Sequence, residues 1–263
     1  MDKGPSCKVC ASSPHEIFKA RILRKYDVSY FYCDMCGFLQ TEEPFWLPES
    51  YHESITLPDT GGLLRSLALA EIISVLIYFI FDRSARYLDY AGGHGLFTRR
   101  MRDIGFDFFW RDRYSPNLLA SGFEYTEDLG SIELITSFES FEHFSDPIKE
   151  IETMLALSRN IIFTTDLLPS PVPQPEDWYY YGLPHGQHIS FYSLRTLQYI
   201  ADRYRLKLYS VYPLHILTPK NLSSASLKLL LRLRGLGLFL YVKRKMRSRT
   251  VDDSIVLDES RRC

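Results

Sequence analysis

The sequence has almost no net charge, and this absence narrows the choice of partners. It contains 31 Lys and Arg against 32 Asp and Glu, which gives a net charge of −1 and a pI near 6.7. Without a basic excess there is no general attraction for a polyanion, so nucleic acid is not an expected partner. With 263 residues, 46% of them hydrophobic, the chain is long enough for one large α/β domain and a small appendage.

Cysteine is missing from the whole stretch between Cys36 and Cys263, and the start Met1–Pro5 has no apolar segment of the kind found in a secretory leader. Both absences argue against a secreted protein held together by disulfides. We therefore expect a cytoplasmic protein and another use for the cysteines that are present.

Four cysteines form two Cys-x-x-Cys pairs with 22 residues between them. Two close pairs of thiolates suit tetrahedral zinc, and Gly37 lets the backbone turn so that N–H groups point toward the sulfur atoms. Because a segment this small needs a metal to fold, the sequence predicts a structural zinc module over residues 1–42. Its ligands are Cys7, Cys10, Cys33 and Cys36; four unrelated cysteines are the alternative.

Residues 43–62 combine prolines, aromatics and a Gly-Gly pair, which is typical of a linker or lid. The candidate functional side chains in it are Tyr51, His52, Asp59 and Thr60. The alternative is that the aromatic side chains only pack this loop against the core.

The following stretch, Leu63–Phe81, is long and apolar enough to raise the question of a membrane span. Arg65 and Glu71 interrupt it, and a charge near the centre of a span is costly. A core-facing helix is the favoured interpretation.

From residue 63 onward helix and strand patterns alternate. We expect helices at 63–81, 96–104, 116–121 and 146–157, and strands at 86–90, 107–111, 133–138 and 160–165. This alternation predicts an α/β, Rossmann-like domain over residues 63–215, with a parallel sheet and helices on both of its faces.

A glycine-rich turn, Asp89–Gly95, lies between the strand at 86–90 and the next helix. Gly has no side chain to keep a ligand from the backbone, and the helix N-terminus offers N–H donors. Asp112 follows Asp89 by 23 residues and is placed to accept hydrogen bonds from the ribose hydroxyls of an adenosine cofactor. The turn therefore predicts a nucleotide-like cofactor.

The glycine spacing favours S-adenosylmethionine over NAD. No glycine stands three residues beyond Gly95, as a pyrophosphate-binding turn would require. The early Asp89 would repel a pyrophosphate but helps to hold a cationic amino-acid group.

These residues resemble the first motif of class I S-adenosylmethionine-dependent methyltransferases, an acidic residue followed by Gly-x-Gly-x-Gly. Asp89, Ala91, Gly93 and Gly95 match it, with Ala91 in place of the usual first glycine and Gly92 as an extra one. The resemblance implies that Asp89, Ala91, Gly92, Gly93 and Gly95, with Asp112, bind the cofactor.

The segment Phe138–Pro147 is similar to the Glu-His-x-x-Asp-Pro segment that follows the fourth strand in many of these enzymes. Because that segment recurs with many substrates, Glu142 and His143 are interpreted as scaffold or cofactor-side residues. Glu139, just after the strand, is a further cofactor-binding candidate.

A narrower resemblance covers most of residues 1–220 and points to bacterial methyltransferases with an N-terminal zinc module, related to sugar C-methyltransferases. It rests on the cysteine pairs, the Tyr51–Gly61 stretch, Asp89–Met101 and Gly186–Ser193. It implies His188 as general base, with Tyr51 near the site, and a small-molecule substrate such as a nucleotide-linked sugar. Gln187 stands where the sugar enzymes have Glu.

His188 follows a loop, Asp166–Gln187, that is rich in proline and aromatic residues and that we expect to cover the substrate side. An imidazole titrates near neutral pH, which suits a base, and His185 is the second candidate. The alternative is a packing histidine that holds the helix at 194–204.

The tail, residues 216–263, is basic and Leu-rich: between 220 and 250 it has nine Lys or Arg and no acidic residue. Such a segment can lie on an anionic membrane, but packing on the domain is favoured, and Gly235 and Gly237 should break a long helix. Residues 248–263 are expected to be disordered.

The leading hypothesis is a zinc-stabilised methyltransferase that uses S-adenosylmethionine and acts on a sugar or another small polar metabolite. A non-catalytic binding module that keeps the fold is the second hypothesis. An NAD-dependent oxidoreductase is the third, and the form of the glycine turn disfavours it.

Overall fold

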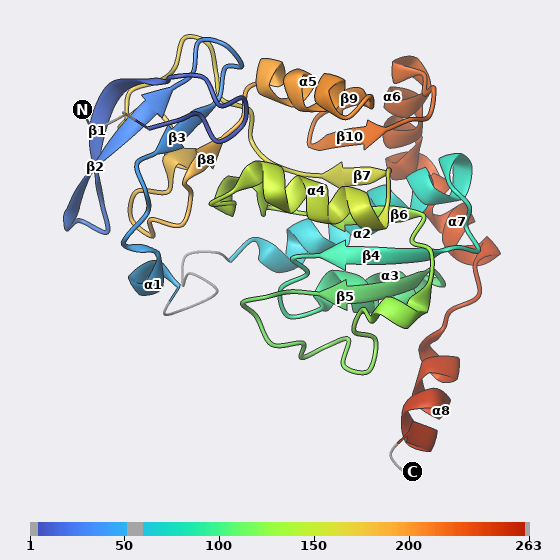
Figure 1. Ribbon diagram of the computed structural model, residues 1–263. Coiled ribbons are helices and arrows are strands. Elements are labelled where there is room, and N and C mark those ends of the chain that lie inside the picture. Colours follow the sequence, from blue (N-terminus) through green and yellow to red (C-terminus); the bar gives the residue numbers. More distant parts are fainter. Residues whose placement is uncertain (1–4, 52–59, 261–263) are drawn as a thin grey trace. The chain divides into compact units, whose positions relative to one another are not determined.

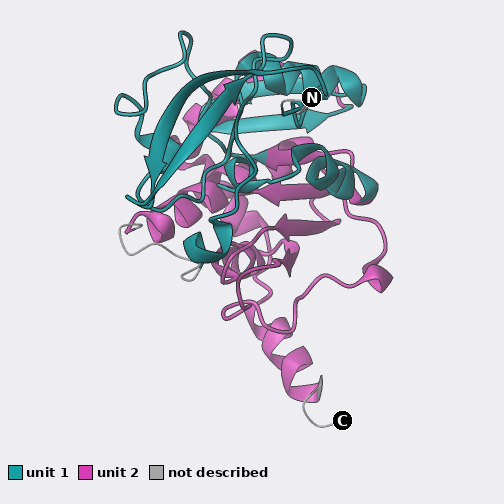
Figure 2. Ribbon diagram, turned by 60° about the vertical axis from the view of Figure 1, so that its left-hand side comes forward, with its two compact units in different colours: residues 1–56, 138–156, 163–219 teal, residues 57–137, 157–162, 220–263 magenta. Residues whose placement is uncertain are grey.

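The computed structural model describes residues 5–51 and 60–260. The chain forms two compact units, drawn in separate colours in Figure 2. Unit 1 comprises residues 1–56, 138–156 and 163–219, and unit 2 comprises residues 57–137, 157–162 and 220–263. Each unit is described by itself.

Unit 2 contains the glycine turn and a parallel sheet (Figure 1). Its elements are α2 (Gly62–Ile80), β4 (Arg86–Tyr90), α3 (Leu96–Ile104), β5 (Asp107–Arg111), η1 (Glu127–Leu129), β6 (Leu134–Ser137) and β7 (Ile161–Phe163), which reaches the unit boundary. The strands are ordered β5-β4-β6-β7, and β4 pairs in parallel with both β5 and β6. In this register Asp89 lies beside Trp110 and Thr136.

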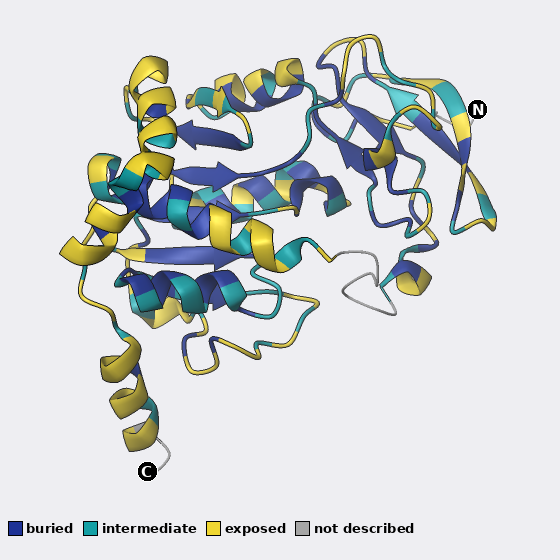
Figure 3. Cartoon of the chain, turned by 180° about the vertical axis from the view of Figure 1, so that it is seen from behind, coloured by how far each residue is buried: buried dark blue, intermediate teal, exposed yellow. Residues whose placement is uncertain are grey.

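The strands of this sheet are buried, dark blue in Figure 3, because their residues are mostly large and apolar. The expected elements at 63–81, 86–90, 96–104, 107–111 and 133–138 are confirmed within one or two residues. With four cysteines gathered near the N-terminus, the predicted fold class, a Rossmann-like sheet with a small cysteine module, is confirmed.

Helix α2 is the one described helix that is long and apolar enough to cross a membrane, by length and composition only. Within its most apolar window 44% of the residues are buried. The buried face runs from Leu69 to Ile77, and the helix packs on α3 and on α7 of the same unit. That packing agrees with the core-facing interpretation.

The helix expected near 116–121 is wrong, since residues 112–122 form an irregular loop. The N–H groups of Leu118 and Leu119 donate to the carbonyl of His94, and the N–H of Ala120 donates to the side chain of Asn117. These bonds take up the donors that a helix would need, and the amide of Asn117 competes with helix formation.

The basic tail folds into two helices, α6 (Ser224–Leu233) and α7 (Phe239–Lys245), joined by the π-type turn η4 (Arg234–Leu238). Leu236 and Gly237 have non-helical backbone angles, so the predicted break is confirmed. Leu227, Phe239 and Val242 are buried, and α2 contacts both helices.

The expectation of disorder after residue 248 is wrong for the residues that the structure describes there. Thr250–Ser260 forms α8, and Asp253 on it is buried. Its carboxylate accepts hydrogen bonds from Arg102 at 2.6 and 2.8 Å and from Arg99 at 2.8 Å. The sequence does not reveal this pairing because Arg102 is about 150 residues away. Cys263 lies outside the described residues.

Unit 1 contains the cysteine pairs, one four-stranded sheet and a β-hairpin. A four-stranded sheet has the order β1-β2-β3-β8, and β9 and β10 pair as an antiparallel hairpin. The elements are β1 (His15–Ile22), β2 (Tyr26–Tyr32), β3 (Leu39–Thr41), α1 (Leu47–Ser50), η2 (Phe141–His143), α4 (Pro147–Leu157), η3 (Tyr179–Tyr181), β8 (Ser190–Phe191), α5 (Leu194–Arg203), β9 (Lys207–Val211) and β10 (Leu214–Thr218).

The aromatics of the 166–187 loop belong mostly to the core of unit 1. Tyr180 and Tyr181 are buried with Tyr30 and Phe191 in one apolar cluster. Only Tyr179 among them is exposed. The loop therefore packs on the β1-β2-β3-β8 sheet, and its buried aromatic side chains contribute to the core of unit 1.

We expect Asp253→Asn to lower the free energy of unfolding by roughly 3–5 kcal/mol, because it leaves the buried guanidinium of Arg102 without its main counter-charge. Urea-induced unfolding measures the change. The matched control is Asp252→Asn, whose ion pair with Arg247 is exposed and should contribute less than about 1 kcal/mol. Equal effects of the two variants would contradict the role of the buried pair.

Candidate functional site

The turn after β4 has three residues with positive φ: Ala91 at 58°, Gly93 at 53° and Gly95 at 84°. Glycine adopts this region without strain, whereas alanine pays roughly 1–2 kcal/mol for it. The usual glycine at position 91 is thus replaced by a residue that strains the turn, and the turn forms nevertheless.

Two glycines of the turn differ in how much space surrounds them. A Cβ on Gly92 would lie 2.7 Å from the Asp89 carboxylate and 2.8 Å from the Trp110 ring. At Gly93 a Cβ would meet nothing within 4 Å. Gly92 therefore packs against β4 and β5, and the backbone at Gly93 borders open space.

Asp112 holds the turn from the next strand. One of its carboxylate oxygens accepts the N–H of Gly93 at 2.9 Å, and the other accepts the N–H groups of Tyr114 and Ser115 at 2.7 and 2.8 Å. The indole of Trp110 donates to the carbonyl of Gly93. Asp112 is thus in direct contact with the glycine turn.

Asp89 is buried and faces the interior of unit 2. Its carboxylate accepts the hydroxyl of Thr98 on α3 at 2.9 Å and that of Thr136 on β6 at 3.2 Å. Burial, with the nearby charge of Asp112, raises the pKa of Asp89 to about 7. The side chain therefore joins β4, α3 and β6.

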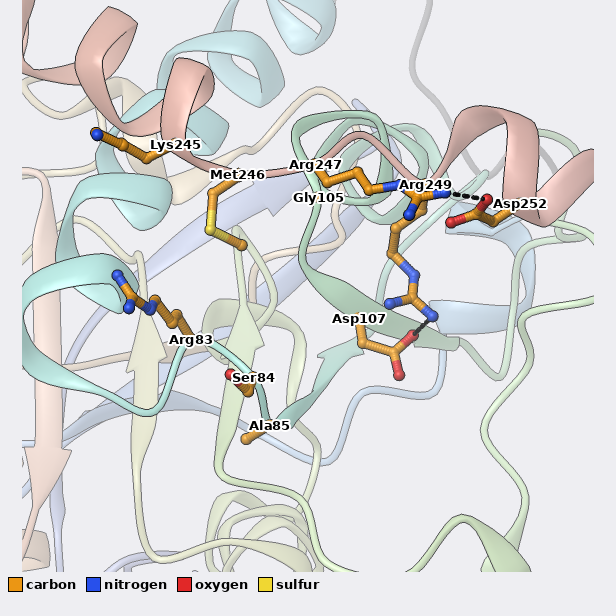
Figure 4. A pocket seen from close by; sticks show the side chains of 10 residues that line it. All are labelled: Arg83, Ser84, Ala85, Gly105, Asp107, Lys245, Met246, Arg247, Arg249 and Asp252. Carbon is orange, nitrogen blue, oxygen red and sulfur yellow. Dashed lines mark hydrogen bonds and ion pairs between the residues drawn. The ribbon is translucent and has the colours of Figure 1, made fainter.

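A hollow of about 400 Å³ in unit 2 lies at the opposite, amino ends of β4 and β5 (Figure 4). Arg247 and Arg249 on its rim are paired with Asp252 and Asp107. Cofactors of such sheets bind at the carboxyl ends of the strands, so this hollow is not the expected cofactor site.

The four cysteines of unit 1 are gathered at one point. The sulfur atoms of Cys7 and Cys36 are 3.6 Å apart, and those of Cys10 and Cys33 are 3.4 Å apart. Around a tetrahedral zinc with bonds of about 2.3 Å, sulfur atoms lie about 3.8 Å apart. The arrangement fits one zinc ion with four sulfur ligands.

Backbone groups support the same arrangement. Gly37, with φ of 74°, donates its N–H to the carbonyl of Cys33 at 2.8 Å, which closes the turn after the second pair. A hydrogen bond with Cys36 lowers the pKa of the Cys7 thiol, and the N–H groups of Cys10 and Val9 lower it further. Such N–H groups offset thiolate charge.

A cluster of histidines forms a second group of polar side chains in unit 1. The hydroxyl of Tyr51 is 3.0 Å from Nδ1 of His143. The ring of His143 meets the ring of His188 edge-on, with centroids 4.9 Å apart, and His185 lies 4.8 Å from His188. The three catalytic candidates, Tyr51, His185 and His188, are thus brought together around His143.

The hydrogen bonds of this loop fix the tautomers of His188 and His185. Nδ1 of His188 lies 2.6 Å from the carbonyl of Tyr180, so it carries the proton and leaves Nε2 as an acceptor. Nδ1 of His185 accepts the N–H of Gln187. Burial lowers the pKa of His188 to about 4 and also lowers the pKa of His143 and of His185.

Two glutamates flank the cluster. Glu142 is fully buried, and neither of its carboxylate oxygens has a hydrogen-bond partner among the described residues. Burial and the charge of Glu139 raise the pKa of Glu142 to about 8. Glu139 is exposed, with its carboxylate on the hydroxyl of Thr164 at 2.6 Å.

The predicted residues therefore fall into three groups: the cysteines and the histidine cluster in unit 1, and the glycine turn with Asp112 in unit 2. Thr60 is exposed, and His52 and Asp59 lie outside the described residues. Sequence reasoning missed that Glu142 and His143 lie beside His188. The Glu-His dipeptide was a signal, but nothing in the sequence gives its partner 45 residues later.

A sequence-family model described as "Methyltransferase domain" matches residues 64–211, more than half of the chain. The chain belongs to this family of methyltransferase domains. A comparison with curated proteins finds no match.

Solved structures with a related fold are methyltransferases as well. The plantazolicin methyltransferase BpumL in complex with SAH is 16% identical, with 76% of this chain and 90% of that chain covered and a TM-score of 0.46. OxaC in complex with SAH and oxaline is 17% identical, with 56% and 46% covered and a TM-score of 0.42. The mitomycin 7-O-methyltransferase MmcR is 11% identical, with 65% and 59% covered and a TM-score of 0.43. Likenesses at this level carry no functional argument.

We expect Asp89→Asn to flatten the pH dependence of stability. Because the folded-state pKa of about 7 is above the unfolded value, the contribution of Asp89 to stability falls as pH rises from about 4 to about 7. Asparagine does not titrate, and its amide can bond both threonine hydroxyls. Urea-induced unfolding at about pH 5 and about pH 8 measures the difference; parallel pH profiles for variant and wild type would rule out a titrating Asp89.

Proposed function

We propose that this chain transfers a methyl group from S-adenosylmethionine to a small polar metabolite, such as a nucleotide-linked sugar. The observation that carries the proposal is the glycine turn held by Asp112, within a chain that belongs to a methyltransferase family. The S-adenosylmethionine cofactor, when bound, supplies an electrophilic methyl group on its sulfonium.

The residues of the turn fit such a cofactor. Open space beside Gly93 lets a ligand reach the backbone, as a Cβ there would meet no atom. The oxygen of Asp112 that accepts the N–H of Gly93 has a second lone pair, so the side chain can hold the turn and still accept a ribose hydroxyl. Asp89, Ala91, Gly92 and Gly95 shape the turn, and we propose Glu139 as a further cofactor contact.

His188 is the proposed proton acceptor for an acceptor group that must lose a proton on methylation. Nε2 carries the lone pair because Nδ1–H donates to Tyr180. Tyr51 shares a hydrogen bond with His143 and is proposed to orient the acceptor, and His185 is the second candidate base.

The second candidate function is a binding module that keeps the fold without catalysis. The low pKa of His188, about 4, favours it, because a base with so low a pKa draws a proton weakly at neutral pH. The two functions differ in turnover and agree in cofactor binding.

For the cysteine module we propose one structural zinc ion on Cys7, Cys10, Cys33 and Cys36. The sulfur spacing and the N–H groups directed at the sulfur atoms support it. Arg195 donates to the carbonyl of Met35, and so the second cysteine turn is bonded to α5.

Isothermal titration with S-adenosylmethionine and with its demethylated product tests the proposal. We expect binding of both, and at least about a tenfold loss of affinity in Asp112→Ala, since hydrogen bonds to a charged group are lost. Asp128→Ala, in an exposed loop of the same unit, is the control. No binding of either compound would sink the enzyme hypothesis.

For turnover, labelled S-adenosylmethionine is incubated with a panel of nucleotide-linked keto-sugars. His188→Asn should abolish transfer and keep cofactor affinity, because the side chain is proposed to act on the acceptor only. If an active acceptor is found and the variant still turns over, the base assignment is wrong.

Elemental analysis of the purified chain tests the zinc proposal. We expect zinc bound to the wild type, and Cys33→Ser to lose one equivalent and unfold at a lower temperature, since four-sulfur sites contribute directly to folding. Ser12, whose hydroxyl lies 3.0 Å from the sulfur of Cys33, provides the control variant Ser12→Ala, which should keep the metal. Equal zinc content in wild type and Cys33→Ser would exclude the site.

A further inference from the structure

Three ligand-type side chains of unit 1 converge away from the cysteines. Glu142, His143 and His188 each offer one ligand atom, and these atoms all lie within 4.8 Å of one another. Glu142 and His143 come from η2, and His188 precedes β8. The carbonyl of Glu142 accepts the N–H of Ile189, which joins the two segments.

No described residue makes a hydrogen bond of good geometry to the carboxylate of Glu142, although the hydroxyls of Thr165 and Tyr180 lie close enough to lower its pKa. Asp89 and Asp253, the two buried aspartates, each accept hydrogen bonds, but neither oxygen of Glu142 has any among the described residues. The nearby hydroxyls of Thr165 and Tyr180 bond to each other at 3.1 Å. A fully buried carboxylate without a partner is costly, and such groups call for a bound ion or water.

Both histidines are oriented as metal ligands usually are. His188 donates Nδ1–H to the carbonyl of Tyr180 at 2.6 Å, and Nδ1 of His143 is bonded to the hydroxyl of Tyr51. Because Nδ1 of His188 is held in this way, Nε2 is presented to an ion. His143 also has a hydrogen bond to the backbone of Gln187, which an ion would have to displace. As whole residues, His143 and His188 are half-buried.

We propose that Glu142, His143 and His188 bind one divalent cation of the first transition series. One carboxylate oxygen and two imidazole nitrogens are a ligand set used for such ions. Their ligand atoms lie about 3–4 Å apart around the ion, which small side-chain rotations reach from the present positions. Three protein ligands leave coordination positions open for water or another oxygen ligand.

This site goes beyond the proposed function and does not depend on it. With Nε2 on the ion, His188 no longer accepts a proton, and an oxygen ligand on the ion loses its proton more readily instead. A change at Glu142 distinguishes the two roles of His188, because a metal ligand at position 188 needs the carboxylate of Glu142 beside it and a proton acceptor there does not.

The test is the metal content of the full chain after dialysis against Co²⁺ and removal of loosely bound ions. Elemental analysis gives the number of ions per chain, and the absorption spectrum separates a four-thiolate site, which shows sulfur-to-cobalt charge transfer, from a nitrogen–oxygen site, which does not. We expect two ions per chain, one of each kind.

Glu142→Gln keeps the shape of the side chain and removes its charge, so the variant should fold. Its nitrogen–oxygen site, the one that shows no charge transfer, should bind Co²⁺ at least about tenfold more weakly. His143→Ala should do the same and keep the thiolate site. His185→Ala is the matched control: its ring also touches His188, but its Nδ1 accepts the N–H of Gln187, so its Nε2 carries the proton and has no lone pair for an ion. It should keep both ions.

The proposal would be overturned if the wild type bound only the thiolate-bound ion, which shows charge transfer. It would also be overturned if Glu142→Gln bound both ions as tightly as the wild type. Neither cofactor nor acceptor is present in the measurement. Its failure therefore leaves the methyltransferase proposal standing, and a failure to bind S-adenosylmethionine leaves the cation site standing.

Discussion

The alternation of backbone angles at Ala91, Gly93 and Gly95 is the constraint on which unit 2 depends. Each positive φ turns the chain, so that β4 ends and α3 begins within a few residues. Asp89 below the turn and Asp112 beside it then hold the neighbouring elements through threonine hydroxyls and backbone N–H groups. Ala91 shows that the surrounding bonds are strong enough to impose this conformation on a residue that resists it.

In unit 1 the corresponding constraint is the pairing of β3 with β8. Leu39 and Gln40, a few residues after the cysteines, pair with Phe191 and Ser190, just after His188. Gln40 also accepts the N–H of Lys8 in the first cysteine turn. The cysteine turns and the loop that carries His185 and His188 are therefore joined to the same sheet, so the proposed zinc ion would also stabilise the segment next to His188.

Features that depend on neighbours in the sequence were predictable. The strand–turn–helix around the glycines, the cysteine pairs and the break at Gly237 follow from local backbone chemistry, and each has its expected form. The rest depends on distant partners. Helix α8 requires Arg102, the loop at 116–121 requires the carbonyl of His94, and the cluster around His188 requires η2.

Gln187 is bonded to a segment of unit 1 that lies far away in the sequence. Its buried amide donates to the carbonyl of Ser50 at the end of α1. An ionised acidic side chain there would place oxygen against oxygen in a buried site, and α1 would have to move. The presence of Gln rather than Glu at position 187, directly before His188, is therefore coupled to the backbone of α1. A change to Glu at position 187 would therefore have to be matched at the end of α1.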